Sequence, residues 1–291
     1  MDQAKQLRDL MSSSNSINKN SLSARVITIS SGKGGVGKTN FSINLAIYFA
    51  SLKKRVVVID ADFGLANVEV LLGTRPEYNF YHIIKGEKSI SEVMVDTKYG
   101  IKFISGGNGL RELSNINNTE IKYFIEQFDY LDKIFDIIII DTGAGISRSV
   151  TNFIMASDES IIVTTPEPTA FTDAYTLIKI IKEQNKDINK LKLVVNKADD
   201  KNEADRLFNK MANVTSKFLG IELENIGYIP SDLDLIKAVK QQKPAVLFYP
   251  ESQFAKSVKN IGNNILKQKN DDNNKDGVKG FMKKLINIFG K

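Results

Sequence analysis

Short apolar runs rich in β-branched residues alternate with longer helical segments from Arg25 onward, and this alternation restricts the fold more than any other feature of the chain. It favours a parallel sheet with helices on both faces, and the almost wholly apolar runs indicate strands that are buried on both sides. The sequence therefore predicts an α/β fold with a doubly wound, mostly parallel sheet. The expected strands are residues 25–30, 55–60, 101–105, 135–141, 160–165, 192–197 and 225–229.

Two polar segments divide the 291 residues into a body and two ends. Residues 11–24 are rich in serine and asparagine, and residues 267–277 are polar and charged, as is typical of flexible linkers. We expect residues 25–266 to form one domain. Residues 1–24 would then be an N-terminal motif with its linker, and residues 278–291 a C-terminal helix beyond the second linker.

The net charge of +6 comes from the two ends of the chain. Residues 1–25 contain four basic and two acidic side chains, and residues 267–291 contain seven and three, so the body between them is balanced. A balanced body disfavours DNA as a partner. The chain has no cysteine, which excludes disulfides and thiolate metal sites. With no secretory signal and no apolar run of spanning length, we expect a cytoplasmic protein.

A glycine-rich loop follows the first expected strand and precedes a helical run. It fits the pattern G-x-x-x-x-G-K-[ST] in the strand-to-helix context that this pattern requires. The glycines turn backbone N–H groups toward phosphate oxygens, Lys38 reaches the β and γ phosphates of ATP, and Thr39 ligates Mg²⁺. The predicted ATP-binding residues here are Gly32, Lys33, Gly34, Gly35, Val36, Gly37, Lys38, Thr39 and Asn40.

Carboxylates stand at the ends of two other expected strands. Asp60 and Asp62 end the run VVVIDAD, and Asp141 ends the run IIIID. Because open α/β sheets bind ligands at the carboxyl ends of their strands, these side chains belong beside the loop. Asp141 has the position of a Walker B carboxylate, which orients Mg²⁺ through water. The two aspartates of the D-x-D segment could instead cap the next helix.

The loop GKGGVGKT resembles the deviant Walker A loop of the MinD/ParA family of P-loop ATPases, whose signature is the early lysine, here Lys33. The resemblance implies that Lys33 touches the phosphates of ATP in a second subunit, so that two chains close face to face over two nucleotides. Such a cation acts on charge that develops during phosphoryl transfer, as an arginine finger does. It also implies slow, dimer-dependent ATP hydrolysis. The alternative is a solvated surface lysine.

The resemblance also implies roles for residues outside the loop. Asp62 would position or activate the attacking water, and Asp60 would help to hold the Mg²⁺ shell. Asn196 resembles the asparagine that reads adenine in this family, and Pro230 lies in the loop that usually lines the base. Iron–sulfur carriers share the loop but need cysteines, so the composition excludes them.

The first residues, DQA-x-x-LR, resemble the activator motif of the FlhG branch of the family, also called FleN or YlxH. The resemblance implies that Asp2, Gln3, Leu7 and Arg8 lie in a helix that binds the flagellar GTPase FlhF, with Gln3 helping to trigger GTP hydrolysis. Residues 145–150 and 164–175 also resemble this branch. The implied function is regulation of flagellar number or placement, with basal-body (C-ring) proteins as further partners.

The last residues form a basic amphipathic helix on a helical wheel. A short helix of this kind suits an anionic membrane surface, where each lysine adds ~1 kcal/mol. It resembles the membrane-targeting tail of MinD-type ATPases, which implies reversible attachment to the inner face of the cell membrane. The alternative is a final helix docked on the body. Its apolar face contains Val278, Phe281, Met282, Leu285, Ile286, Ile288 and Phe289.

Two other functions fit the same loop. A division-site MinD would share the chemistry but would have no use for the N-terminal motif. A ParA-like ATPase that positions DNA or cargo would bind DNA nonspecifically, with a steep dependence on salt.

Overall fold

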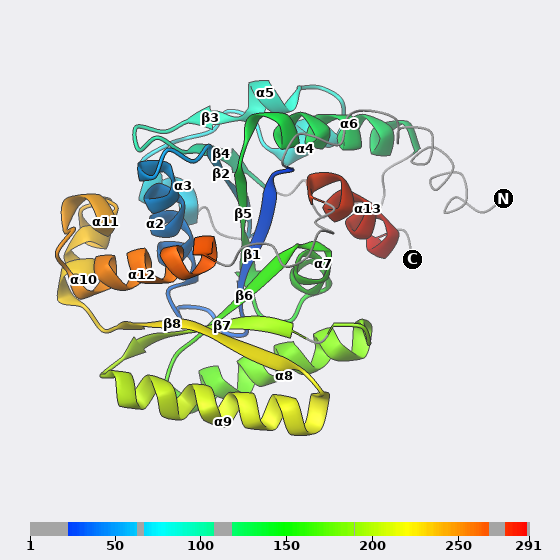
Figure 1. Cartoon of the computed structure of the whole chain (residues 1–291). Helices are drawn as coiled ribbons and strands as arrows, with labels where there is room; N and C mark the ends of the chain where they lie inside the picture. The colour runs from blue at the N-terminus through cyan, green and yellow to red at the C-terminus, as the bar shows by residue number, and fades with distance from the viewer. Residues whose placement is uncertain (1–22, 63–66, 108–117, 189, 268–276, 290–291) are drawn as a thin grey trace.

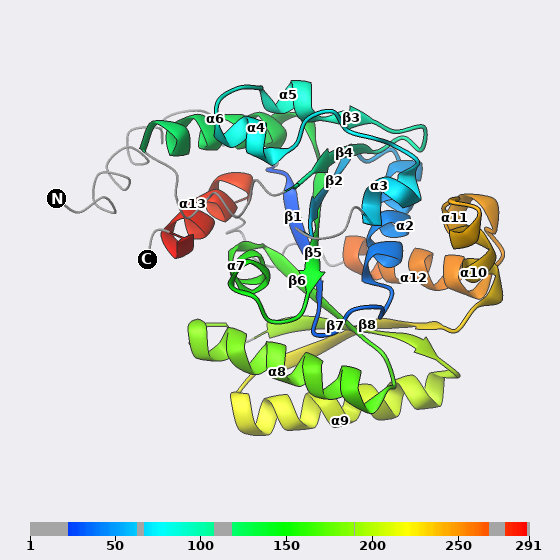
Figure 2. The same cartoon turned by 180° about the vertical axis from the view of Figure 1, so that it is seen from behind.

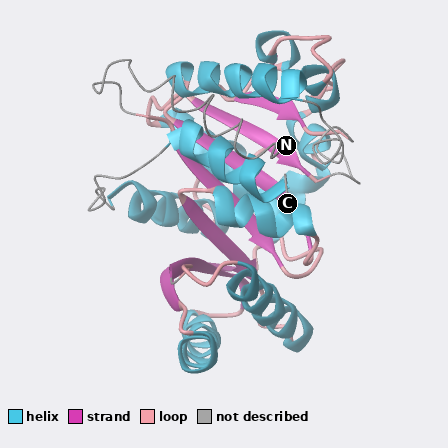
Figure 3. Cartoon of the chain, turned by 90° about the vertical axis from the view of Figure 1, so that its right-hand side faces the viewer, coloured by secondary structure: helices cyan, strands magenta, loops and turns pink. Residues whose placement is uncertain are grey.

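An eight-stranded sheet with helices on both faces forms the centre of the protein (Figure 1, Figure 3). The structure is a computed structural model and describes residues 23–62, 67–107, 118–188, 190–267 and 277–289. The strands are β1 Arg25–Ser31, β2 Val56–Ala61, β3 Val95–Asp96, β4 Lys102–Ser105, β5 Ile137–Ala144, β6 Glu159–Thr164, β7 Lys190–Ala198 and β8 Glu222–Pro230.

The strand order is β3-β4-β2-β5-β1-β6-β7-β8. Only β3 runs antiparallel to its neighbour among the pairs of this described sheet. The predicted doubly wound, mostly parallel α/β fold is therefore confirmed, and each of the seven expected strands overlaps an observed one. The edge strand β3 was not expected, because two residues are too few to make a recognisable apolar run.

The helices cover the sheet in three groups. On one face α2 and α12 lie against the strands, on the other α6, α7 and α13, and α8 and α9 cover the end of the sheet formed by β7 and β8 (Figure 1, Figure 2). The helices are α2 Lys38–Ser51, α3 Asn67–Leu72, α4 Phe80–Ile84, α5 Ile90–Val93, α6 Asn118–Ile134, α7 Arg148–Ala156, α8 Pro168–Gln184, α9 Lys201–Leu219, α10 Leu233–Lys240, α11 Ala245–Phe248, α12 Gln253–Lys267 and α13 Gly277–Phe289.

The strand register brings the polar strand ends together. Asp60 of β2 pairs with Asp141 of β5, and Ile29 of β1 pairs with the same Asp141. All three strands are parallel, so their carboxyl ends form one edge of the sheet, and the glycine-rich loop leaves β1 at that edge. The β-branched residues that fill β1, β2 and β5 are buried on both faces, and Asp60 and Asp141 lie at or near the carboxyl ends of β2 and β5.

Helix α13 is docked on the body, between α6 and α7 (Figure 1, Figure 2). Four side chains of its apolar face are at most 2% exposed, and the Phe281 ring stacks on Phe153 with centroids 6.2 Å apart. The structure thus has the docked arrangement that the sequence left as the alternative to a free membrane helix. The reason is that an apolar helix face that could enter a bilayer can also pack against the apolar side chains of α6 and α7. The four are Val278, Phe281, Met282 and Leu285.

Some predicted residues cannot be placed. Asp2, Gln3, Leu7 and Arg8 lie outside the described residues, and the side chains of Ile288 and Phe289 lie outside the described part of α13. Among the described helices, none is long and apolar enough to cross a bilayer.

Candidate nucleotide-binding site

The loop between β1 and α2 is held in a conformation that needs glycine at two positions. Gly37, at the N-cap of α2, has φ 90°, and a Cβ there would lie 2.3 Å from Nδ2 of Asn196. A Cβ on Gly32 would lie 2.3 Å from the carbonyl carbon of Asp173 in α8. The glycines therefore permit both a left-handed turn and the close approach of the loop to α8.

The lysine and threonine of the loop reach the Walker B carboxylate. Lys38 is buried, and its Nζ donates to Oδ1 of Asp141 at 2.9 Å, while Oγ1 of Thr39 donates to Oδ2 at 2.7 Å. Ser42, one helical turn further on, donates to Oδ1 at 2.8 Å. Sequence reasoning missed Ser42, although a hydroxyl four residues after the loop lysine is on the same helical face. Three side-chain donors thus converge on the two carboxyl oxygens of Asp141.

Asp60 lies beside this network, and its charged form is disfavoured by its surroundings. Burial of its carboxyl and then the charge of neighbouring Asp141 raise the pKa of Asp60 to about 8, although the backbone N–H of Asp62 donates to it at 3.0 Å. The site therefore has more negative than positive charge nearby. An oxygen-rich site of this kind fits a hard divalent cation.

Mg²⁺ would find a partial ligand set in these residues. The described residues contain no group of three or more His, Cys, Asp or Glu that could hold a metal by themselves. Thr39, Asp60 and Asp141 are oxygen donors at one edge of the sheet, and the phosphates of a bound nucleotide would supply the remaining ligands, as is usual for Mg²⁺.

Asp62 lies next to the carboxyl end of β5. Its Oδ1 would be 3.3 Å from a Cβ on Gly143, so the glycine leaves room for this carboxylate. The N–H of Gly145 donates to the carbonyl of Ser31 at 2.9 Å, which fastens the loop after β5 to the start of the phosphate-binding loop. The structure therefore brings Asp62 next to the end of β5, and the residue that follows β5 next to the start of the phosphate-binding loop.

Lys33 does not point at its own loop. Its Nζ donates to Oε2 of Glu167 at 2.9 Å and to Oγ1 of Thr169 at 2.7 Å, at the start of α8. The hydrogen bond from Lys33 lowers the pKa of the Glu167 carboxyl. Neither partner was found from the sequence, because both are more than a hundred residues from Lys33 and no local pattern marks them.

Asn196 supports the loop from the side. It is buried, and its Nδ2 donates to the carbonyl of Val36 at 2.6 Å. Lys197, with φ 56°, donates to the carbonyl of Gly35 at 2.8 Å, a contact that sequence reasoning missed. Pro230 ends the neighbouring strand β8, opposite Ala198. The two residues predicted to contact the base thus lie on adjacent strand ends.

Known proteins with this architecture point to one family. The family described as "AAA domain" matches residues 24–195. Antiactivator FleN of Pseudomonas aeruginosa is 33% identical over 262 residues, which cover 90% of this chain and 93% of that protein. The flagellum site-determining protein YlxH of Helicobacter pylori is 34% identical and is matched over 99% of both chains.

Relatives in cell division are also similar. The septum site-determining protein MinD of Synechocystis is 36% identical over 227 residues, which cover 77% of this chain and 82% of that protein. A structure of the MinC:MinD cell division protein complex of Aquifex aeolicus superposes with a TM-score of 0.65 at 26% identity, over 84% of this chain and 96% of that one. The chain therefore is an ATPase of the MinD/ParA-type P-loop family, and within that family it is most like the FlhG (FleN, YlxH) branch.

Proposed function

We propose that the protein is an ATP-dependent, dimerising ATPase that cycles on and off the membrane and regulates the number or placement of flagella. The observation that carries the flagellar role is the similarity to the flagellum site-determining protein YlxH along 99% of both chains, which includes the two ends as well as the ATPase body.

The chemical step is assigned to the residues at the carboxyl edge. When a nucleotide enters, Lys38 exchanges Asp141 for phosphate oxygens, and the freed carboxylate becomes available to the cation. Mg²⁺, when bound with ATP, neutralises charge on the phosphates. Asp62 positions the attacking water. Its place beside Gly143, two residues after Asp141 in β5, supports this role because it lies close to the Walker B carboxylate.

Dimerisation is assigned to Lys33. In the single chain this lysine is held by Glu167 and Thr169 on the surface, with a side chain that is 37% exposed. Exposed ion pairs contribute only about 0–1 kcal/mol, so little stability is lost when Lys33 leaves Glu167 for the ATP of a second subunit. Contact with the phosphates of the partner subunit then makes ATP the ligand that joins two chains.

Membrane attachment is assigned to α13. Its apolar residues Phe281, Met282 and Leu285 are covered by the body in the single chain, so the helix must leave its groove before it can enter a bilayer. Lys283 and Lys284 are exposed on its opposite face and suit an anionic surface. One such helix binds weakly, whereas two in a dimer raise avidity by roughly 10² to 10⁴.

The flagellar partners are assigned to the N-terminal end. Asp2, Gln3, Leu7 and Arg8 would bind and stimulate an FlhF-type GTPase, and basal-body (C-ring) proteins are further partners. The test is the GTPase rate of FlhF with the full chain and with Gln3→Ala. A stimulation that Gln3→Ala removes supports the flagellar role, whereas no stimulation favours the division-site MinD function, which the similarity to MinD of Synechocystis keeps in consideration.

Co-sedimentation with anionic liposomes under ATP, ADP and no nucleotide tests the membrane cycle. Asp62→Ala should accumulate ATP dimers and bind more. A chain truncated after Gly277 should not bind, but truncation also uncovers the groove of α13. Lys283→Glu with Lys284→Glu is the matched variant, because it keeps the docked apolar face and should lose about 1 kcal/mol of attraction for each lysine removed. Binding that ignores nucleotide and both tail variants would instead favour a ParA-like ATPase, and DNA binding with a steep salt dependence would establish it.

A further inference from the structure

Helices α10 and α11 carry a concentration of exposed apolar side chains. Of the ten large hydrophobic residues that are exposed in the described part of the chain, four lie within residues 233–248. They are Leu233 at 74%, Ile236 at 51%, Leu247 at 45% and Phe248 at 48% exposure. Scattered exposed hydrophobic residues need no explanation, but a cluster on neighbouring helices marks an interaction site.

The exposed face of α10 combines apolar and basic residues. Leu233, Ile236, Lys237 and Lys240 follow the spacing i, i+3, i+4, i+7 and are all exposed, whereas Ala238 on the opposite side is buried. In the next segment Lys243 lies over the ring of Phe248, 5.0 Å from its centroid. Lys237 forms an ion pair with Asp234 of the same helix at 2.9 Å, so the remaining positive charge around the apolar centre of the α10–α11 surface comes from Lys240 and Lys243.

This surface is firmly attached to the body and lies close to the nucleotide edge. The side chain of Asp232 accepts from the N–H of Asp234 at 2.7 Å and from the N–H of Phe254 at 2.8 Å, so it caps α10 and ties the helix to α12. Helix α10 begins shortly after Pro230, at the end of β8. A rigid surface is preorganised to bind, because little conformational freedom is lost.

The charge of the surface selects the partner. A second copy of the chain placed on it by a two-fold axis would set lysines against lysines, which is unfavourable. The tail helix α13 lies on the opposite side of the molecule (Figure 1, Figure 2) and is itself basic. A helix with an apolar stripe flanked by acidic residues would complement both the apolar centre of this surface and its positive charge.

We propose that the α10–α11 surface is the docking site for an acidic amphipathic helix of a partner protein. The helix lays its apolar stripe on Leu233, Ile236 and Phe248, while its carboxylates meet Lys240 and Lys243. This is recognition of a helix through anchors at i, i+3, i+4 and i+7. The partner would bind next to Pro230 at the end of β8 and away from α13, the helix assigned to membrane attachment.

A designed peptide tests the proposal on the full chain. The probe is a fluorescent helical peptide with leucines at i, i+3, i+4 and i+7 and glutamates between them, compared with a scrambled peptide of equal composition. Fluorescence anisotropy should show binding of the patterned peptide only. Leu233→Ser with Ile236→Ser should weaken binding about tenfold or more, as expected for central anchors, and Lys240→Glu with Lys243→Glu should weaken it in a salt-dependent way, as expected for charges at the rim.

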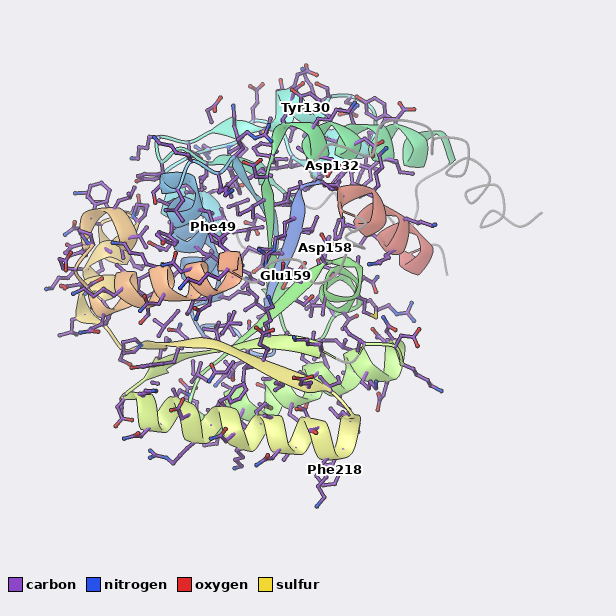
Figure 4. All side chains as sticks on the ribbon, in the orientation of Figure 1. Phe49, Tyr130, Asp132, Asp158, Glu159 and Phe218 are labelled. Carbon is purple, nitrogen blue, oxygen red and sulfur yellow. The ribbon has the colours of Figure 1, made fainter. Side chains whose placement is uncertain are left out.

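The matched control lies on α9. Phe218 is 66% exposed, and Lys217 lies over its ring, 5.4 Å from the centroid, so Phe218→Ser with Lys217→Glu removes the same chemistry elsewhere (Figure 4). Its effect should stay within about twofold. Equal binding of the scrambled peptide, or an equal loss in the α9 variant, overturns the proposal. So does loss of ATP-dependent dimers or of anionic vesicle binding in the variants of the α10–α11 surface, because a second copy or a membrane would then be the occupant.

Discussion

Both the amino and the carboxyl edge of the sheet bury a carboxyl group near positive charge, but the pKa is lowered at the amino edge and raised at the carboxyl edge. At the amino edge Glu159 begins β6 and is paired with Arg25 and Lys192 (Figure 4). Burial opposes its ionisation, yet the hydrogen bond and charge of Arg25 and the charge of Lys192 prevail and lower the pKa of Glu159 to about 2. Arg25 also donates to the carbonyl of Ile265 at 2.9 Å, so the network joins the start of β1 to the C-terminal part of α12.

At the carboxyl edge the balance is reversed. Lys38 is paired with Asp141, and Asp60 remains beside them with its pKa raised to about 8 by burial and by the charge of Asp141. One lysine therefore serves a pair of buried carboxylates. The comparison indicates two uses of buried charge: at the amino edge one carboxylate shared by two cations joins neighbouring strands, and at the carboxyl edge two carboxyl groups that share one lysine are suited to a further cation.

The largest expected effect is on stability, at the amino edge. Glu159→Gln keeps the shape but leaves two nearly buried cations without their shared carboxylate, and we expect the free energy of unfolding to fall by about 3–5 kcal/mol. Urea unfolding measures it. The matched control is Asp136→Asn, because the Arg55–Asp136 pair is largely exposed and should contribute about 1 kcal/mol or less. Equal losses in the two variants would contradict the distinction.

The same carboxylate predicts a pH dependence. Its pKa is 4.5 before folding and about 2 in the folded chain, so its contribution is complete above about pH 4.5 and is lost as the pH falls toward 2. Glu159→Gln has no such group. The difference in unfolding free energy between the two proteins should therefore shrink over that range, and a difference that stays constant would show that Glu159 is not held ionised by its neighbours.

At the carboxyl edge the larger effect should be on activity. Lys38→Met removes the cation that we propose to contact the phosphates, and we expect ATP turnover to fall by roughly 10²–10³. Thr39 and Ser42 still donate to Asp141, so the thermal midpoint should change less than in Glu159→Gln. A phosphate-release assay and circular dichroism measure the two quantities. A loss of stability equal to that of Glu159→Gln would remove the contrast between the edges.

Removal of the buried Asp60 carboxyl should stabilise the nucleotide-free protein. Asp60→Asn takes away a buried carboxyl that lies next to Asp141, and we expect the unfolding free energy at pH 7 to rise by up to about 4 kcal/mol, because each pH unit between the ordinary pKa of 3.8 and pH 7 corresponds to about 1.4 kcal/mol. Thermal unfolding in the absence of nucleotide and Mg²⁺ measures it. The stabilisation by Mg²⁺ and ATP should be smaller in the variant, and an unchanged ligand effect would exclude Asp60 from the cation site.

The sequence predicts the carboxyl edge far better than the amino edge. Asp60 and Asp141 follow apolar runs, and the rule that parallel strands end at one edge suffices to place them together. Arg25 and Glu159 are 134 positions apart, and so are Lys33 and Glu167. Such pairs depend on which strands and helices become neighbours in space, and a single sequence does not encode that locally.

The tail helix shows a different limit. The apolar face with Phe281 and Leu285 was read correctly as one face of a helix, but hydrophobic periodicity reports only that the face avoids water. A bilayer and the groove between α6 and α7 satisfy it equally. The occupant of an amphipathic face is therefore decided by the rest of the molecule, and here the groove takes it in the single chain.

The smallest expected effect concerns Ser42, which only the structure identified. Its hydroxyl oxygen lies 2.8 Å from Oδ1 of Asp141 and 3.0 Å from the carbonyl oxygen of Lys38, so its single proton can be donated to either acceptor. Because Lys38 and Thr39 also hold Asp141, Ser42→Ala should lower the unfolding free energy by only about 1 kcal/mol. ATP turnover should change by less than about tenfold, because the phosphate contacts remain. Ser42→Thr keeps the hydroxyl and is the control. If Ser42→Ala were as inactive as Lys38→Met while Ser42→Thr stayed active, the hydroxyl itself would belong to the nucleotide machinery, and the network around Asp141 would act as one unit rather than as a set of exchangeable donors.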